Sequence, residues 1–397
     1  MAKNLYIVNS YSPVRVIFGA GRLQELATVK LPGKHALLCV TADHIMEKMG
    51  VQQKVLELLK ENGVEVTVYD EVVPNPTRAS VMKASKLAND SGCDFFIGLG
   101  GGSSIDTAKA AAIMNRMPGD LWDYANSESG GRKEVTDAAP VVVISTTAGT
   151  GTECDYFCVI TNEETGEKLD FGLEAIFPTV SIIDPELMMS LPKGLTAFQG
   201  IDALFHAVEN YICNAGESKL IELYAEEAIR LLTEWLPLAV EDGNNLEART
   251  NVAYAACVLE GFNQALTFVT SHHILGQALG GVFPKFPHGA TLSTIAEAYY
   301  KEIKQYIPED FEKLGEFMGE PSVPGDPGQS YINGLTKLMD KIGIRKASMS
   351  QFGVDPSKFQ EAIDTAVDVV GIDMDRYELS KDDLMRILMT SWEFNEA

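Results

Sequence analysis

The segment from Gly98 to Lys109 constrains the fold of this chain more than any other stretch. It begins after the apolar run 95–97, contains three consecutive glycines at 100–102, and continues into an alanine-rich stretch at 107–114. A strand, a glycine turn and a helix start in succession let the backbone approach a phosphate closely, because glycine has no Cβ and a helix N-terminus presents free N–H groups. The segment therefore predicts a strand–turn–helix unit that can hold a phosphate.

The glycine spacing differs from the usual dinucleotide fingerprint, G-x-G-x-x-G. Counted from Gly98, the sixth position is Ser103 instead of glycine. Ser103 and Ser104 are expected to cap the helix that follows. A tight strand-to-helix turn without a ligand is the alternative interpretation, since glycine turns are common. The glycines alone leave both interpretations open.

Strand-like and helix-like segments alternate through the first half of the chain. The expected strands are 36–41, 64–69, 95–99 and 141–145, with 157–161 and 180–183 as the last strands of this half, and the expected helices are 53–62, 81–90 and 105–116. Such alternation predicts a mostly parallel sheet with helices on both faces.

Helical periodicity replaces this alternation after about residue 188. Long helical segments are expected at 201–214, 218–239 and 247–266, and more helical sequence follows the proline- and glycine-rich loop 321–328. We therefore expect an α/β domain over residues 1–188 and an all-α domain over residues 189–397.

The charge and hydropathy of the chain argue against nucleic acids and membranes as binding partners. The 397 residues carry a formal net charge of −24, which argues against nucleic acid or an anionic membrane as a partner. No apolar run approaches the roughly 18 residues that a membrane-spanning helix needs, and the N-terminus lacks the pattern of a signal peptide. The expected location is therefore cytoplasmic.

The six cysteines contain no CxxC pair. Cys154 and Cys158 could in principle share a metal ion, but both stand in a strand-like run. Reduced thiols in the core are the favoured interpretation for a chain of this kind.

Together with Asp106 and Lys109, the glycine segment resembles the GGGSxxDxAK motif of the iron-containing, or group III, alcohol dehydrogenases. Other motifs of that family follow in the family's order over nearly the whole chain, namely Ser12-Pro13, 18–21 (FGAG), 74–77 (PNPT), 146–153 (TTAGTGTE), 184–187 (DPEL), 200–204 (GIDAL) and 287–289 (PHG). The resemblance implies a Rossmann-like domain followed by a helical domain, with the active site in the cleft between them.

A candidate metal site begins with Asp202 and His206, which are four residues apart and therefore share a face of the predicted helix. A solvated helix face is the alternative for such a pair on its own. The resemblance implies one aspartate and three histidines as ligands, which adds His273 and His288. Anchoring on the run 279–281 (LGG) selects His273 over its neighbour His272, and the longer gap before His288 is interpreted as a loop insertion.

One carboxylate and three imidazoles suit Fe²⁺ or Zn²⁺, and the sequence does not choose between them. Most relatives have a further histidine, a proposed proton relay, where this chain has Gln277. Glutamine does not titrate, so Gln277 is expected to orient water or a substrate oxygen. Proton exchange would then use bound water, the cofactor ribose or His272, which is expected about 100° away from His273 around the helix and able to line the pocket.

The resemblance also implies NAD as cofactor. The pyrophosphate would lie against the glycine turn, and other positions would flank the nicotinamide or the ribose groups. The implied cofactor residues are Gly100, Gly101, Gly102, Ser103 and Asp106, then Thr146, Thr147 and Thr150 near the nicotinamide, and Asn75 and Lys168 near the ribose groups. A plain surface lysine is the alternative for Lys168. Asp43, after the expected strand 36–41, would bind the adenosine ribose and select NAD over NADP, a role compatible with capping the next helix.

These features favour an NAD- and metal-dependent alcohol dehydrogenase or aldehyde reductase. The main alternative is a lyase related to dehydroquinate synthase, but such sites need several Arg and Lys side chains for a phosphorylated substrate. Between Ser145 and Gly289 the only arginines are Arg230 and Arg249, outside the motifs. A non-catalytic nucleotide-binding protein is a third possibility, which the complete set of four metal ligands argues against.

The expected substrates are small alcohols, diols or their aldehydes. A small anionic aldehyde such as sulfoacetaldehyde is a minor option, with His272, Gln277 and Lys285 as possible anion contacts. We also expect a homo-oligomer, because oligomers are usual in the family.

Overall fold

The computed structural model describes residues 8–189, 191–373 and 375–396. Its contacts divide the chain into two compact units. One is Tyr11–Ser190, and the other is Leu191–Ala397 with the described residues before Tyr11. Among the described residues, no helix is long and apolar enough to cross a membrane.

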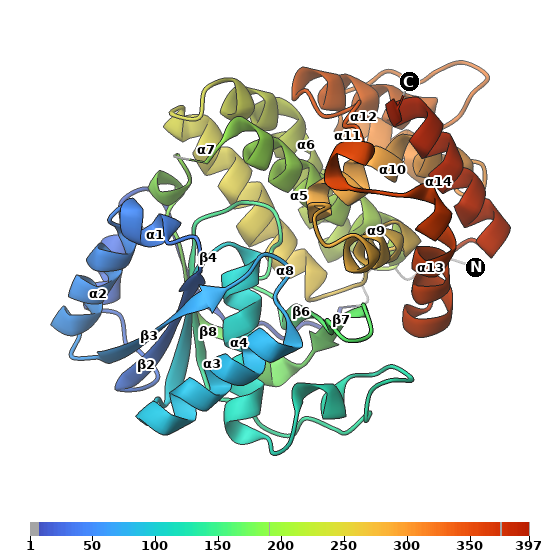
Figure 1. Cartoon of the computed structure of the whole chain (residues 1–397). Helices are drawn as coiled ribbons and strands as arrows, with labels where there is room; N and C mark the ends of the chain where they lie inside the picture. The colour runs from blue at the N-terminus through green and yellow to red at the C-terminus, as the bar shows by residue number, and fades with distance from the viewer. Residues whose placement is uncertain (1–7, 190, 374, 397) are drawn as a thin grey trace. The chain divides into compact units, whose positions relative to one another are not determined.

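A six-stranded sheet forms the centre of the first unit (Figure 1). All its neighbouring strands are parallel. In sheet order, the strands are β1 (Arg15–Phe18), β8 (Pro178–Ile183), β5 (Val141–Ser145), β4 (Phe95–Gly100), β2 (His35–Thr41) and β3 (Glu65–Val72). The parallel sheet confirms the α/β fold expected from the alternating sequence.

Helices cover both faces of this sheet (Figure 1). The connecting elements are η1 (Arg22–Ala27), α1 (Ile45–Lys48), α2 (Val51–Glu61), α3 (Arg78–Ser91), α4 (Gly102–Arg116), η2 (Leu121–Tyr124), η3 (Glu174–Ile176) and η4 (Pro185–Met188). On one face, alternate residues of β2 such as Leu38 pack with Val55 and Leu58 of α2 in one apolar cluster. On the other face, Gly98 allows close approach of α4, since a Cβ there would lie 2.7 Å from the Cα of Ile105.

Two local expectations differ from the structure. The segment Phe157–Thr161 (β6) is not part of the large sheet, because it pairs antiparallel with Lys168–Gly172 (β7) in a separate two-stranded sheet. The turn between these strands closes through a hydrogen bond from Asn162 N–H to the carbonyl of Glu167. The cap of α4 is Gly101, so Ser103 lies inside the first turn and does not precede it.

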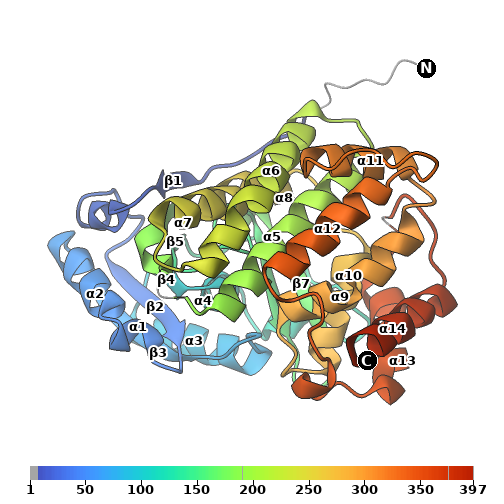
Figure 2. The ribbon, with the colours of Figure 1, turned by 90° about the horizontal axis from the view of Figure 1, so that it is seen from above.

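Helices build the second unit. They are α5 (Lys193–Asn214), α6 (Lys219–Glu241), α7 (Leu246–Ala253), α8 (Glu260–Gln264), α9 (Ser271–Val282), α10 (His288–Ile303), α11 (Pro308–Phe317), α12 (Gln329–Lys341), α13 (Phe359–Asp364) and α14 (Lys381–Glu396), with the short turns η6 (Ser350–Phe352) and η7 (Pro356–Lys358) and the π turns η5 (Tyr254–Leu259) and η8 (Thr365–Val370). Helix α5 lies along α6 (Figure 2), and α10 packs against α5, α9 and α14. Residues 200–212 of α5 are buried throughout, which places this helix in the core of the unit.

The expected single helix 247–266 consists of α7, the π turn Tyr254–Leu259 and α8. Glu260 begins α8 and is fully buried. Its Oε2 has no hydrogen-bond partner among the residues that the structure describes, while Asn263 reaches Oε1 at 3.5 Å. Burial therefore raises the pKa of Glu260 well above its ordinary value of 4.5.

We expect Glu260→Gln to stabilise the protein increasingly as pH rises. Between the unfolded and folded pKa values, the folded wild type keeps a proton that the unfolded chain releases, so wild-type stability falls by about 1.4 kcal/mol per pH unit. The neutral amide removes this loss. Thermal unfolding of both proteins at pH 5 and pH 8 measures the difference, and a variant less stable than wild type at pH 8 would contradict the expectation.

All six cysteines are free, and five of them are buried.

Candidate metal centre and cofactor site

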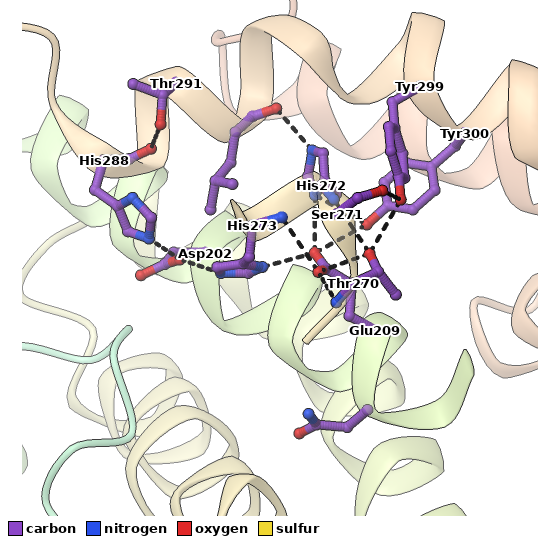
Figure 3. Close-up of polar contacts among 12 residues, drawn as sticks. Asp202, Glu209, Thr270, Ser271, His272, His273, His288, Thr291, Tyr299 and Tyr300 are labelled. Carbon is purple, nitrogen blue, oxygen red and sulfur yellow. Dashed lines mark hydrogen bonds and ion pairs between the residues drawn. The ribbon is translucent and has the colours of Figure 1, made fainter. Parts of the chain in front are cut away.

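Three helices of the second unit bring the predicted metal ligands together (Figure 3). Asp202 and His206 lie one turn apart on α5, His273 lies in the first turn of α9, and His288 is the first residue of α10. The Nε2 atoms of His273 and His288 lie 3.3 and 3.6 Å from Asp202 Oδ1. One ligand atom from each of Asp202, His206 and His273 falls within a 4.8 Å group. The rings of His206 and His273 are stacked with centroids 4.3 Å apart.

The site is deeply buried, with one partly open side. Asp202, His206 and His273 are at most 7% exposed, whereas the His288 side chain is 25% exposed. Burial favours the neutral form of Asp202, but the adjacent histidines outweigh it and hold the pKa of this carboxyl below its usual range. An ionised carboxylate beside three imidazoles fits a divalent ion such as Fe²⁺ or Zn²⁺.

The glycine turn of the first unit packs against the threonine-rich loop after β5. A Cβ on Gly101 would lie 2.9 Å from the Thr147 side chain, and one on Gly102 would lie 2.9 Å from the Thr150 side chain, so a larger residue at either position would displace a threonine. Gly100 has a φ of 143°, and its carbonyl accepts a hydrogen bond from Thr146 N–H at 2.9 Å. The two predicted cofactor segments are therefore in direct contact, and the N-terminus of α4 follows them.

The predicted ribose residues lie in two places. Lys168 is buried at the start of β7 and donates to Asn75 Oδ1 at 2.9 Å, so the surface-lysine alternative is wrong. Asp43 is exposed just beyond β2, where Oδ1 accepts from Thr41 Oγ1 at 2.7 Å and from Ile45 N–H at 3.0 Å. The carboxylate of Asp43 therefore shapes the turn before α1.

Sequence profiles cover both units. Residues 13–185 match the profile described as iron-containing alcohol dehydrogenase, and residues 196–392 match the C-terminal profile of the Fe-containing alcohol dehydrogenase family. The chain belongs to the iron-containing alcohol dehydrogenase family. As a member, it is an NAD-dependent alcohol oxidoreductase, which confirms the expected enzyme class over a dehydroquinate-synthase-like lyase.

Individual alcohol dehydrogenases resemble it over most of their length. The 1,3-propanediol dehydrogenase of Klebsiella pneumoniae is 36% identical over 361 residues, which are 89% of this chain and 88% of the relative. The NAD-dependent methanol dehydrogenase of Bacillus methanolicus is 35% identical over 325 residues, which are 79% of this chain and 81% of the relative. The crystal structure of NADH-dependent butanol dehydrogenase A from Thermotoga maritima superimposes with a TM-score of 0.89 at 26% identity, covering 98% and 99% of the two chains.

In this alcohol dehydrogenase, the carboxylate of Asp106 is engaged inside the α/β unit. Its Oδ1 accepts from Thr152 Oγ1 at 3.0 Å and its Oδ2 from Val159 N–H at 3.1 Å. Burial raises the pKa of Asp106 to about 6. This geometry favours a structural role for Asp106 over the expected direct contact with NAD.

Lys109, three residues further along α4, anchors the same loop. Five acceptors lie between 2.7 and 3.0 Å from its fully buried Nζ and share its three N–H groups. They are the carbonyl and hydroxyl of Thr152, the carbonyl and carboxylate of Asp155, and the carbonyl of Phe157. The motif that contains Lys109 did not predict this contact, although a single lysine in an alanine-rich helix is itself a signal of a buried cation.

His272 is fully buried and points away from the predicted ligands. Its Nδ1 lies 2.8 Å from Glu209 Oε1 and its Nε2 lies 3.1 Å from the carbonyl of Leu292. Its ring is nearly perpendicular to that of His273. Both ring nitrogens are thus engaged, which favours a structural role for His272 over the expected contact with substrate.

Gln277 and Lys285 are more exposed to solvent than His272. Gln277 is half-buried one turn after His273 on α9, so the two side chains share a helix face. Lys285 is exposed between α9 and α10.

Proposed function

We propose that this protein is an NAD(H)- and divalent-metal-dependent dehydrogenase of small primary alcohols or diols, and a reductase of the corresponding aldehydes. The observation that carries the proposal is the convergence of four ligating side chains from α5, α9 and α10. Asp202, His206, His273 and His288 would hold Fe²⁺ or Zn²⁺. When bound, such an ion acts as a Lewis acid toward a substrate oxygen.

Hydride transfer needs a carrier, because no side chain supplies hydride. We assign the pyrophosphate of NAD to the turn Gly100–Gly102 and the adjacent Ser103 at the start of α4, where free N–H groups favour an anion. Thr146, Thr147 and Thr150 would border the nicotinamide half. Asn75 and Lys168 would bind ribose hydroxyls, and the contact between them orients both groups.

Gln277 would orient the substrate oxygen or a water molecule through its amide. Because glutamine does not titrate near neutral pH, the proton released on alcohol oxidation would leave through bound water or the cofactor ribose. His288 is the most exposed of the proposed ligands, so the substrate would approach from its side of the metal centre.

The dehydrogenases of 1,3-propanediol and methanol among the relatives support small, polar substrates. An anionic aldehyde such as sulfoacetaldehyde would need a cation, and Lys285 is the candidate for that role. A panel of short-chain aldehydes, hydroxyaldehydes and sulfoacetaldehyde, assayed by the loss of NADH absorbance, ranks these options. No NADH oxidation with any aldehyde would contradict the proposal.

Asp43→Asn is expected to raise the ratio of kcat/KM with NADPH to kcat/KM with NADH by about tenfold, or roughly 1.4 kcal/mol. The carboxylate should repel a 2′-phosphate, whereas the amide has the same shape without the charge. The amide oxygen can still accept the bonds from Thr41 and Ile45, so the local fold should persist. An unchanged ratio, or a wild type that prefers NADPH, would show that Asp43 does not select the cofactor.

A further inference from the structure

The carboxylate of Glu209 lies at the centre of a buried hydrogen-bond network behind the metal centre (Figure 3). Glu209 is on α5, two turns after Asp202, and is fully buried. Its Oε1 lies 2.6 Å from His273 Nδ1 and 2.8 Å from His272 Nδ1. Its Oε2 accepts from both the N–H and the hydroxyl of Thr270 at 2.9 Å.

These contacts make Glu209 a fixed acceptor. An ionised carboxylate is costly to bury unless donors surround it. Here both oxygens are engaged, and Tyr300 Oη adds a contact with Oε1 at 3.4 Å. The two described ion-pair partners of Glu209 are histidines, so the negative charge is directed at the imidazoles.

The two ring nitrogens of His273 consequently have different tasks. Nδ1 faces the Glu209 carboxylate, which can only accept, so this contact favours the tautomer with its proton on Nδ1, and Nε2 is turned toward Asp202 Oδ1 at 3.3 Å. Histidine binds a metal ion through a nitrogen without a proton, and the hydrogen bond at the other nitrogen decides which one that is. His272 also directs Nδ1 at Glu209, but its Nε2 faces the Leu292 carbonyl and not Asp202. Turning His272 toward Asp202 would break both of these contacts.

We propose that Glu209 is a positioning residue that determines which of two adjacent histidines binds the ion. It fixes the tautomer and ring orientation in which His273 presents Nε2, and the same carboxylate keeps His272 out of the site. This inference rests on the metal centre proposed above.

The test measures metal binding in the full-length chain. Glu209→Gln replaces one acceptor oxygen by an NH₂ group, which must face the donors of either the histidines or Thr270. We expect Zn²⁺ affinity, measured by competition with a chromophoric chelator, to fall about 10- to 100-fold. The visible bands of bound Co²⁺ should also shift, because the orientation of His273 changes. Glu260→Gln is the matched control, since it changes another fully buried glutamate of the same unit, and it should keep wild-type affinity and spectrum.

Thermal unfolding shows whether each variant is folded. Wild-type Zn²⁺ affinity and Co²⁺ bands in folded Glu209→Gln would overturn the role of Glu209 while leaving the metal centre intact. No binding of either ion by the wild type would instead overturn the proposed function. If Glu209→Gln does not fold, Glu209→Asp serves as the second variant, because it keeps the charge but withdraws it by one methylene. Weaker Zn²⁺ binding in Glu209→Asp supports the proposal, and unchanged binding overturns it.

Discussion

Replacing His273 by alanine is expected to remove the bound ion and to lower the rate of alcohol oxidation about a thousandfold, or by roughly 4 kcal/mol in activation free energy. His273 Nε2 lies in the group of ligand atoms with Asp202 and His206, and the smaller side chain leaves a gap in that group. Elemental analysis of the purified variant, together with its kcat for a good substrate, measures both effects.

His272→Ala is the adjacent control. It should keep the ion, because both nitrogens of His272 are engaged away from the ligand group. The variant should lower the free energy of unfolding by about 2–4 kcal/mol, since it opens a cavity and removes the buried polar contacts of the imidazole. Loss of metal in His272→Ala with retention in His273→Ala would reverse the assignment of the ligand.

Lys109→Met is expected to lower the free energy of unfolding by about 3–5 kcal/mol, the usual cost of breaking a buried ion pair by removing one partner. The Asp155 carboxylate and three carbonyl oxygens would lose their shared donor. The loop that carries Thr146–Thr152 would then be less fixed, and NADH affinity should fall as well.

Denaturant unfolding and NADH fluorescence titration measure these two effects of Lys109→Met. Lys86→Met is the control, because Lys86 is an exposed lysine on α3 whose ion pair with Asp90 faces solvent, and it should change neither quantity. Wild-type stability in Lys109→Met would mean that the loop is held by other contacts.

The main sheet was predictable because its strands are buried runs separated by helices of regular length. Residues 95–100 and 141–145 are buried at every position, as expected of central parallel strands. The hairpin of β6 and β7 was not predicted as a pair. Burial alternates along β6, but in β7 the alternation starts only at Leu169, because Lys168 at the start of the strand is also buried. The π turn in 247–266 was also missed, since an extra residue in one turn leaves helical periodicity nearly unchanged.

Helical periodicity predicted only those parts of the candidate metal centre that lie within a single helix. Asp202 and His206 share a face of α5 by spacing alone, but their meeting with α9 and α10 depends on long-range packing. For the same reason the sequence did not indicate Glu209, whose partners Thr270, His272 and His273 lie more than 60 residues away. The buried contacts of Asp106 likewise reach residues 152 and 159, which no local pattern identifies.

The most direct test of metal-dependent hydride transfer is the rate of aldehyde reduction by NADH before and after removal of bound metal. The full-length protein is treated with a chelator, dialysed, and then given one equivalent of Fe²⁺ or Zn²⁺ per chain, with Asp202→Asn treated in parallel. We predict that chelation abolishes the rate, that one of these ions restores it in the wild type, and that neither restores it in Asp202→Asn. A chelated wild type that contains no metal by elemental analysis and still reduces aldehyde at the full rate would contradict the account.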